Sequence, residues 1–257
     1  MLRYLAGLAI ALCAPCAVAA PSFDCKTAES ARELAVCRDK RLAAAYRALD
    51  KAYRAASTHA VAATREALKH DQEEFLNAID FGFPASIWWK AEPSSEQMRK
   101  DIWALKRGGK KDPLADLEAQ LNERVLFLRS LSVPDGFAGL WKNFDTELLI
   151  IPEGDHFLVT YGTYTYGNWS KYECHYTAKY ILDGQVLRTE RAHNIDRWSN
   201  EAVDSHLVIR KAGRMLELEY GSESPEPVCV RKTTPSAPLF HTKLRPENAQ
   251  RLKPRAF

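Results

Sequence analysis

The sequence lacks the motifs by which most enzymes and nucleic-acid-binding proteins are recognised. It contains no Gly-x-Ser-x-Gly, no His-Glu-x-x-His and no phosphate-binding glycine loop. Its charges nearly cancel, because 36 lysine and arginine residues stand against 33 acidic ones and leave a formal net charge of +3. So small an excess does not favour nucleic acid as a partner. We therefore expect a protein that is not an enzyme, holds no cofactor and binds no nucleic acid.

Long apolar runs are absent except near the start of the chain. Residues 5–12 are apolar, and residues 17–19 read Ala-Val-Ala, the small-x-small pattern of a signal-peptidase site. The apolar stretch is about ten residues long, whereas a transmembrane helix needs roughly 20. We expect residues 1–19 to be a secretory signal peptide and the mature chain to begin at Ala20. The mature protein should then lie in the periplasm or outside the cell, with no transmembrane segment.

The cysteines fit an oxidising compartment. Cleavage would remove Cys13 and Cys16, and neither follows the small residue typical of a lipid-attachment cysteine, so a lipoprotein is the weaker alternative. The four that remain are Cys25, Cys37, Cys174 and Cys229. An even number indicates two disulfides, which could pair in three ways. No two of the four have the spacing of zinc ligands, so we expect no metal site.

From about residue 27 to 131 the apolar residues recur at helical spacing. Ser30 to Glu33 fits a capping box, and Asp112-Pro113 fits an N-cap followed by proline at the first helical position. Three apolar faces follow these signals: Leu42, Ala45, Leu49, Ala52 and Tyr53; Leu68, Phe75, Leu76 and Ile79; and Leu114, Leu117, Leu121, Val125 and Leu128. The pattern predicts an antiparallel helical bundle over residues 20–133.

Beyond residues 133–136 the period changes to two. Seven segments are predicted to be strands: 147–151, 156–165, 172–182, 185–191, 206–210, 214–220 and 228–231. Asp183-Gly184 predicts a two-residue hairpin, and residues 211–213 predict a three-residue one. Such a series predicts an antiparallel β-meander or small barrel, closed or nearly closed, over residues 134–243. A basic tail over 244–257 completes an α+β chain of two domains.

Two segments are candidates for contact with a partner. Residues 161–172 combine aromatic, hydroxyl and glycine residues near a strand turn, which favours protein or carbohydrate contact, although their aromatics could instead pack inside the barrel. The basic run at 106–111 is either a solvated turn or a contact for an acidic partner. The candidate binding residues are Tyr164, Tyr166, Trp169, Lys171, Lys106, Arg107 and Lys110.

The N-terminal motifs resemble a known family. The resemblance is carried by Ser22-Phe23-Asp24-Cys25, Cys37, Asp71-Gln72, Phe75-Leu76, Arg124 and residues 127–131. Over about residues 22–131 the chain resembles the N-terminal-domain family of the bacterial lysozyme inhibitor LprI. The resemblance implies a disulfide between Cys25 and Cys37. For the sheet half, Gly139-Leu140-Trp141 resembles the Gly-x-Trp of lipocalin-like barrels.

Two functional hypotheses follow. In the first, a secreted envelope protein binds and inhibits lysozyme-type muramidases, with Lys171, or second the 106–111 loop, reaching the paired carboxylates of the sugar cleft. In the second, a periplasmic ligand- or glycan-binding module holds its ligand in the mouth of the barrel, and the helices dock a partner. A filled barrel interior would argue against the second hypothesis. The sequence leaves the oligomeric state open.

Overall fold

The protein combines helices with a closed sheet, so the predicted α+β class is confirmed. The computed structural model describes residues 23–82, 112–165, 168–189, 194–195, 202–203, 207–220 and 238–243. Within these residues the helices are α1 (Ala31–Arg38), α2 (Lys40–Thr58), α3 (Ala62–Gly82) and α6 (Pro113–Ser130). None of the described helices is long and apolar enough to cross a membrane. The predicted signal peptide and the basic tail lie outside the described residues.

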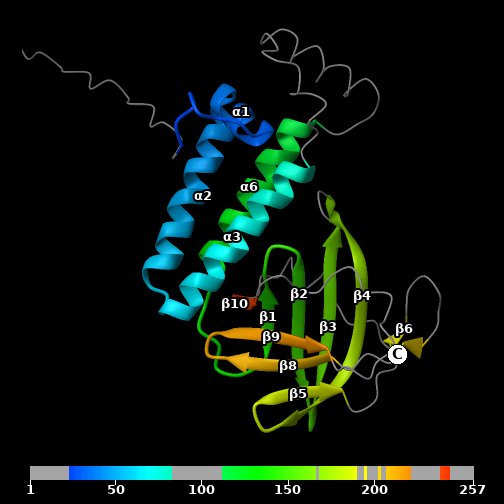
Figure 1. The fold of residues 1–257 in the computed structure, drawn as a ribbon. Helices are drawn as coiled ribbons and strands as arrows, with labels where there is room; N and C mark the ends of the chain where they lie inside the picture. The colour runs from blue at the N-terminus through cyan, green and yellow to red at the C-terminus, as the bar shows by residue number, and fades with distance from the viewer. Residues whose placement is uncertain are drawn as a thin grey trace, which may run out of the picture.

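Eight described strands close into an antiparallel barrel in the order β1-β10-β9-β8-β5-β4-β3-β2. These strands are β1 (Gly139–Lys142), β2 (Thr146–Glu153), β3 (His156–Thr165), β4 (Asn168–Asp183), β5 (Val186–Thr189), β8 (Leu207–Ala212), β9 (Met215–Tyr220) and β10 (Leu239–Thr242). The short strands β6 (Asn194–Ile195) and β7 (Ala202–Val203) pair only with each other among the described residues. The predicted barrel is confirmed, and Figure 1 shows the helices gathered at one end of it.

Two details of the predicted strands change, and a third prediction is not tested. β1 and β10 were not predicted, yet they pair with each other and close the barrel. Each has only four residues, too few for a period of two to stand out. The predicted three-residue turn at 211–213 is wrong, because β8 continues to Ala212 and the turn is Gly213-Arg214, with Gly213 at φ +62°. The predicted strand 228–231 lies outside the described residues.

The helix starts follow the sequence signals. The Ser30 side chain accepts a hydrogen bond from the Glu33 backbone N–H, and the Glu33 carboxylate accepts one from the Ser30 N–H, which confirms the capping box. At the start of α6 the Asp112 carboxylate accepts from the Leu114 N–H, and Pro113 follows Asp112 directly. Both α1 and α6 therefore begin where their own residues satisfy free N–H groups of the first turn.

The helices and three residues of the barrel share one apolar cluster. α2 and α6 both run toward the barrel, and α3 runs in the opposite direction (Figure 1). The predicted apolar faces of these helices are buried together, and the same cluster contains three barrel residues: Phe144, Met215 and Phe240. Phe127 of α6 meets Phe240 of β10 edge to face, with ring centroids 6.3 Å apart. The helical layer is thus packed directly onto the outside of the barrel.

The barrel interior is filled by side chains. Its largest members, Trp141, Tyr161 and Tyr180, are at most 1% exposed. Ten more buried residues complete this cluster: Phe137, Leu148, Ile150, Val159, Ala178, Leu187, Leu207, Ile209, Leu216 and Leu239. Among the described strands, the space that would hold a ligand in a ligand-binding barrel is occupied by the protein's own core.

The Gly-x-Trp triplet has a steric explanation. Gly139 adopts φ +123°, and a Cβ at this position would collide with Nε2 of His241. The His241 ring lies edge-on to the Trp141 ring, with centroids 5.0 Å apart. The Trp141 indole N–H donates to the Phe137 carbonyl across 2.7 Å. The glycine therefore makes room for the ring that packs on the tryptophan.

Candidate functional site

The structure brings three of the predicted binding residues to one end of the β3–β4 hairpin. Tyr164 lies in β3, and Trp169 and Lys171 lie in β4. The two strands remain paired as far as Thr165 and Asn168, with register shifts on both sides of Tyr164. The other four predicted residues, Tyr166, Lys106, Arg107 and Lys110, lie outside the described residues.

This hairpin extends beyond its neighbours in the barrel. β2 pairs with β3 only as far as Thr163, and β5 pairs only with Tyr180–Asp183 of the 16-residue β4. In Figure 1 the hairpin end accordingly rises past the other strands. The backbone at Tyr164, Trp169 and Lys171 therefore occupies the protruding end of the barrel's longest hairpin.

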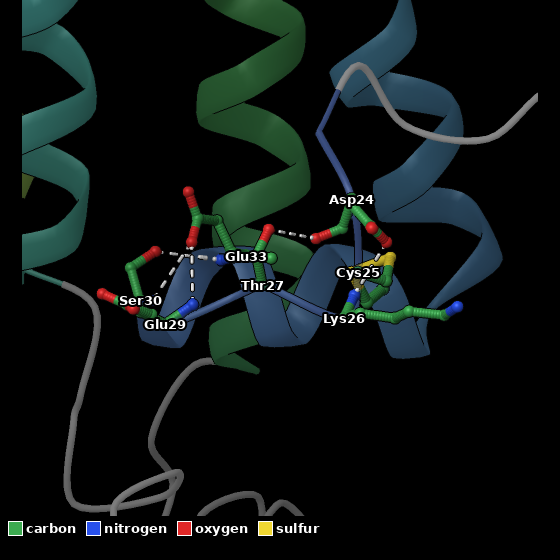
Figure 2. The surroundings of a disulfide bond; sticks show 8 residues. Asp24, Cys25, Lys26, Thr27, Glu29, Ser30 and Glu33 are labelled. Atoms are coloured by element: carbon green, nitrogen blue, oxygen red, sulfur yellow. Dashed lines mark hydrogen bonds between the residues drawn. A yellow bond between two sulfur atoms is a disulfide. The ribbon is translucent and has the colours of Figure 1, made fainter.

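The N-terminal segment is tied to α1 by a disulfide. Cys25 and Cys37 form this bond, which is the pairing that the family resemblance implied. Figure 2 shows how local hydrogen bonds shape the segment: the Lys26 N–H donates to the Asp24 carboxylate, and the Thr27 hydroxyl donates to the Asp24 carbonyl. Of the other two cysteines, Cys174 belongs to β4 and Cys229 lies outside the described residues, so their pairing stays a prediction.

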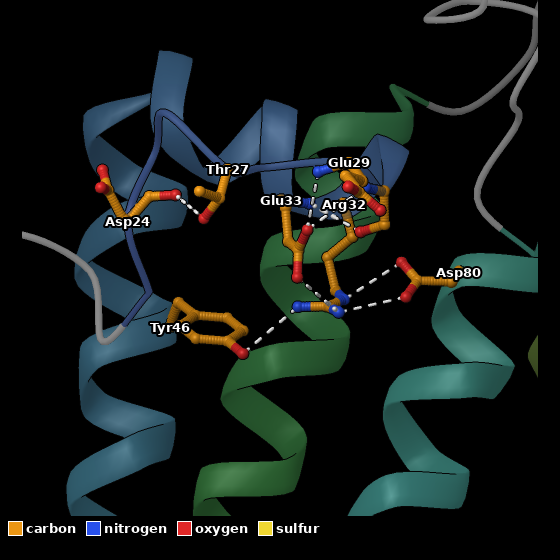
Figure 3. Close-up of polar contacts among 8 residues, drawn as sticks. Asp24, Thr27, Glu29, Arg32, Glu33, Tyr46 and Asp80 are labelled. Carbon is orange, nitrogen blue, oxygen red and sulfur yellow. Dashed lines mark hydrogen bonds and ion pairs between the residues drawn. The ribbon is translucent and has the colours of Figure 1, made fainter.

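A buried arginine holds the same end of the helices together. Nε and Nη2 of Arg32 each lie 3.1 Å from one carboxylate oxygen of Asp80 on α3 (Figure 3). Its Nη1 donates to the Tyr46 hydroxyl on α2 across 3.3 Å. Burial acts to lower the pKa of Arg32, but the hydrogen bonds and charge of Asp80 outweigh it, and the pKa is raised. Arg32 therefore joins α1, α2 and α3 as a permanent cation.

A second buried arginine lies at the joint between helices and barrel. Nη2 of Arg124 on α6 is 2.6 Å from an Asp71 carboxylate oxygen, and Nε donates to the Gln72 side-chain oxygen across 3.0 Å. Its guanidinium also lies over the rings of Phe75 and Phe127, at 5.0 and 4.6 Å. All five residues are among those that carry the family resemblance. Those motif residues are therefore brought together as a buried structural cluster, not as an exposed contact surface.

Asp71 extends this cluster into the barrel. Its other carboxylate oxygen accepts from the backbone N–H of Phe144, in the β1–β2 turn, across 2.8 Å. Burial raises the pKa of Asp71, and the Arg124 guanidinium opposes that rise. One carboxylate thus links α3 and α6 to the barrel backbone.

The β1–β2 turn contains a second buried acid. Burial raises the pKa of Asp145 to about 6; the hydrogen bond from the Thr146 hydroxyl opposes the rise, and the charge of Asp71 adds to it. The Asn143 side chain closes the turn by accepting from the backbone N–H groups of Asp145 and Thr146. A pKa near 6 suits proton transfer. Because the carboxyl is bonded within its own turn and lies near other acids, the described geometry gives it a structural role.

A cavity of about 470 Å³ lies between the helices and the barrel. Apolar side chains form its floor: Ala52, Ala55 and Ala56 of α2, Leu68 of α3, Leu128 of α6 and Phe240 of β10. Lys51, Arg129 and Arg214 line it from α2, α6 and the β8–β9 turn. No acidic residue lines it among the described residues. Figure 1 shows the β8–β9 turn below the adjoining ends of α2 and α3.

Two further groups in this cavity are already engaged. Nδ1 of His241 lies 2.7 Å from the Ser132 hydroxyl. Burial lowers the pKa of His241, so the ring is neutral at pH 7. No sequence pattern predicts this site, because its residues come from separate helices, a turn and the unpredicted strand β10.

Comparison of this chain with protein-family models, with curated proteins and with solved structures finds no match in any of the three. Among the described residues, no group of three or more histidine, cysteine or acidic side chains is placed to hold a metal ion.

Proposed function

We propose that this protein is a secreted, non-enzymatic binding protein of the bacterial envelope, and that it binds and inhibits a lysozyme-type muramidase through the β3–β4 hairpin. The observation that supports this proposal is the length of that hairpin. Its end stands beyond the strands on both sides and carries Tyr164, Trp169 and Lys171. A protruding element of this kind suits the occupation of a concave active site.

The proposed mode of inhibition is polar contact within the sugar-binding cleft. Muramidases cleave with a pair of carboxyl groups on either side of the scissile bond. A lysine ammonium at the hairpin end would donate hydrogen bonds to those carboxylates, and the neighbouring aromatic residue would cover the sugar-binding surface. Lys171 has the first role in this proposal and Trp169 the second.

The filled barrel supports an inhibitor over a ligand-holding barrel. Trp141, Tyr161 and Tyr180 occupy the interior that a ligand would need. The predicted division into a helical domain, 20–133, and a sheet domain, 134–243, belongs to the same proposal. Since Asp71 of α3 binds the Phe144 backbone, we expect the two parts to act as one rigid support for the hairpin.

Inhibition of cell-wall lysis tests this proposal. The mature chain, with its disulfides formed, is titrated into a turbidity assay with c-type, g-type and i-type lysozymes. We expect near-stoichiometric inhibition of at least one class. Lys171→Ala and Trp169→Ala should each weaken it about tenfold or more, as loss of an interface anchor does.

Lys179→Ala is the matched control, because Lys179 is an exposed lysine of the same strand, far from the hairpin end. It should inhibit like the unchanged protein. The triple variant Lys106→Gln, Arg107→Gln and Lys110→Gln tests the second candidate segment. Failure to inhibit any lysozyme class would reject the proposed function.

A further inference from the structure

We propose that the cavity between the helices and the barrel binds a fatty acid, with its acyl chain on the apolar floor and its carboxylate among Lys51, Arg129 and Arg214. The proposal does not depend on muramidase binding. Its site is formed by α2, α3, α6, β10 and the β8–β9 turn, and the β3–β4 hairpin takes no part in it.

The floor fits a hydrocarbon chain. Alanines at positions 52, 55 and 56 leave space where longer side chains would close the gap between α2 and the barrel. Leu68, Leu128 and Phe240 complete an apolar surface. A volume of about 470 Å³ falls within the range of small-molecule sites. Burying a chain there removes apolar surface from water on both partners.

The three basic residues that line the cavity, here called its rim, suit the binding of an anion. Lys51, Arg129 and Arg214 reach the cavity from three elements, and none of them forms an ion pair with any described residue. Three cations with no acidic residue in the same lining are complementary to a negative head group. Near the end of α2, the carbonyls of Ser57 and Ala60 accept hydrogen bonds from the Arg65 side chain and not from these three cations.

An acyl chain fits this cavity better than a peptide does. A bound peptide would bring amide groups that need hydrogen-bond partners, and each one left without a partner is costly. The floor offers few polar groups, and the Ser132 hydroxyl is already bonded to His241. The chain's own tail, residues 244–257, carries four basic residues and one acidic residue, so its charge does not complement the rim.

Ligand titration of the full mature chain tests the proposal. Laurate is titrated against the protein by calorimetry below its micelle concentration, and 1-dodecanol, of equal chain length, serves as the uncharged comparison. We expect one laurate per chain, at least about tenfold tighter binding of laurate than of dodecanol, and no binding of inorganic phosphate.

Two variants distinguish the contribution of the ligand's carboxylate from that of its acyl chain. Arg129→Gln with Arg214→Gln should weaken laurate about tenfold and leave dodecanol unchanged. Ala55→Trp places a large side chain over the apolar floor from an exposed helix position and should weaken both ligands. The charge-matched control is Lys40→Gln with Lys179→Gln, which removes two exposed cations elsewhere and should change neither ligand.

The contrary outcomes are equally definite once circular dichroism shows that each variant is folded. The proposal is overturned if laurate does not saturate, or if the arginine variant and the lysine control bind laurate equally. Tighter binding of dodecyl phosphate than of laurate would replace the fatty acid with a phosphate-headed lipid. Tighter binding of hexaglutamate would show that the rim is a contact for acidic peptides.

Discussion

Two aspartates of α3 each pair with a buried arginine: Asp80 near the C-terminal end of the helix, and Asp71 at the middle of the helix, where the helical layer meets the barrel. The two pairs differ in their surroundings. At one end Arg32 binds Asp80, whose side chain is 30% exposed. Toward the barrel Arg124 binds Asp71, and the two side chains are 2% and 0% exposed. Asp71 also accepts a hydrogen bond from a backbone N–H of the barrel, whereas Asp80 contacts only the helical layer in the described structure. The same ion-pair chemistry therefore closes a solvent-facing end in one case and a dry joint in the other.

The difference bears on what each pair contributes. Breaking a fully buried pair leaves a charge with neither partner nor water, and this costs much more than the pair's net attraction. At a partly exposed pair, water replaces the lost partner and the cost is small. We therefore expect the Arg124 cluster to hold the fold together and the Arg32 network to position α1.

The largest effect is expected when each of the two aspartates is replaced in turn by alanine. Asp71→Ala should lower the free energy of unfolding by about 3–5 kcal/mol, because Arg124 remains buried without its partner. Asp80→Ala should lower it by about 1 kcal/mol, since Asp80 is 30% exposed and its removal opens the site beside Arg32 to water. Urea unfolding followed by circular dichroism measures both. Equal losses of stability in the two variants would contradict the distinction between the Arg124–Asp71 pair and the Arg32–Asp80 pair.

The pH dependence of stability should come chiefly from the barrel end. The pKa of Asp145 is raised from 3.8 to about 6 in the folded chain. Its contribution to stability is therefore fully present below about pH 4 and is lost as pH rises through about 6, a change of up to about 3 kcal/mol. Asn keeps an acceptor for the Thr146 hydroxyl and carries no charge. Relative to the unchanged protein, Asp145→Asn should be more stable at pH 7 than at pH 4, as measured by urea unfolding at each pH.

Loss of the disulfide should affect the Arg32 end alone. The bond joins cysteines 12 positions apart, and replacing both Cys25 and Cys37 with serine should cost about 2–3 kcal/mol. Cys37 and Arg32 both belong to α1, so this change should be non-additive with Asp80→Ala. It should be additive with Asp71→Ala. Coupling energies of similar size with Asp80→Ala and with Asp71→Ala would show that the Arg32 network and the Arg124 cluster are not independent.

The smallest effect is expected from the neutral partners of the two arginines. Tyr46→Phe removes a long hydrogen bond of 3.3 Å at a partly exposed site and should cost about 0.5 kcal/mol. Gln72→Leu leaves the buried Nε of Arg124 without its acceptor and should cost about 1.5 kcal/mol. Thermal unfolding compares the stability of the two variants. A larger loss of stability for Tyr46→Phe than for Gln72→Leu would reverse the expected ranking of the Arg32 network and the Arg124 cluster.

Local signals explain the part of the fold that the sequence predicted. The capping box at Ser30, the N-cap at Asp112 and the turn at Gly184 each depend on residues within a few positions of one another. The helix faces also follow from spacing alone. Because these features need no distant partner, they could be identified before the structure was known.

Long-range contacts explain most of what the sequence did not show. Arg124 and Asp71 are 53 positions apart, and both stood out only as parts of a family resemblance. β1 and β10 are short strands that become strands by pairing across the barrel. The cavity is assembled from helices, a turn and β10, so no single segment announces it. Of the predicted hairpin residues, Tyr164 was predicted on a strand, whereas Trp169 and Lys171 were predicted in the turn before residue 172 and instead lie in β4, which begins at Asn168. Their function awaits the inhibition assay.

The pairing of β1 with β10 also decides when the barrel can be completed. The Thr242 hydroxyl donates to the Leu140 carbonyl across 102 positions of chain, so the closing strand β10 is synthesised long after its partner β1. Until it arrives, β1 and β9 both present open edges, which are the parts of a sheet most prone to pair with other chains. The helices and their disulfide depend on much shorter separations and can form earlier. Folding of this protein should therefore be limited in rate by barrel closure, as expected for non-local pairing of strands.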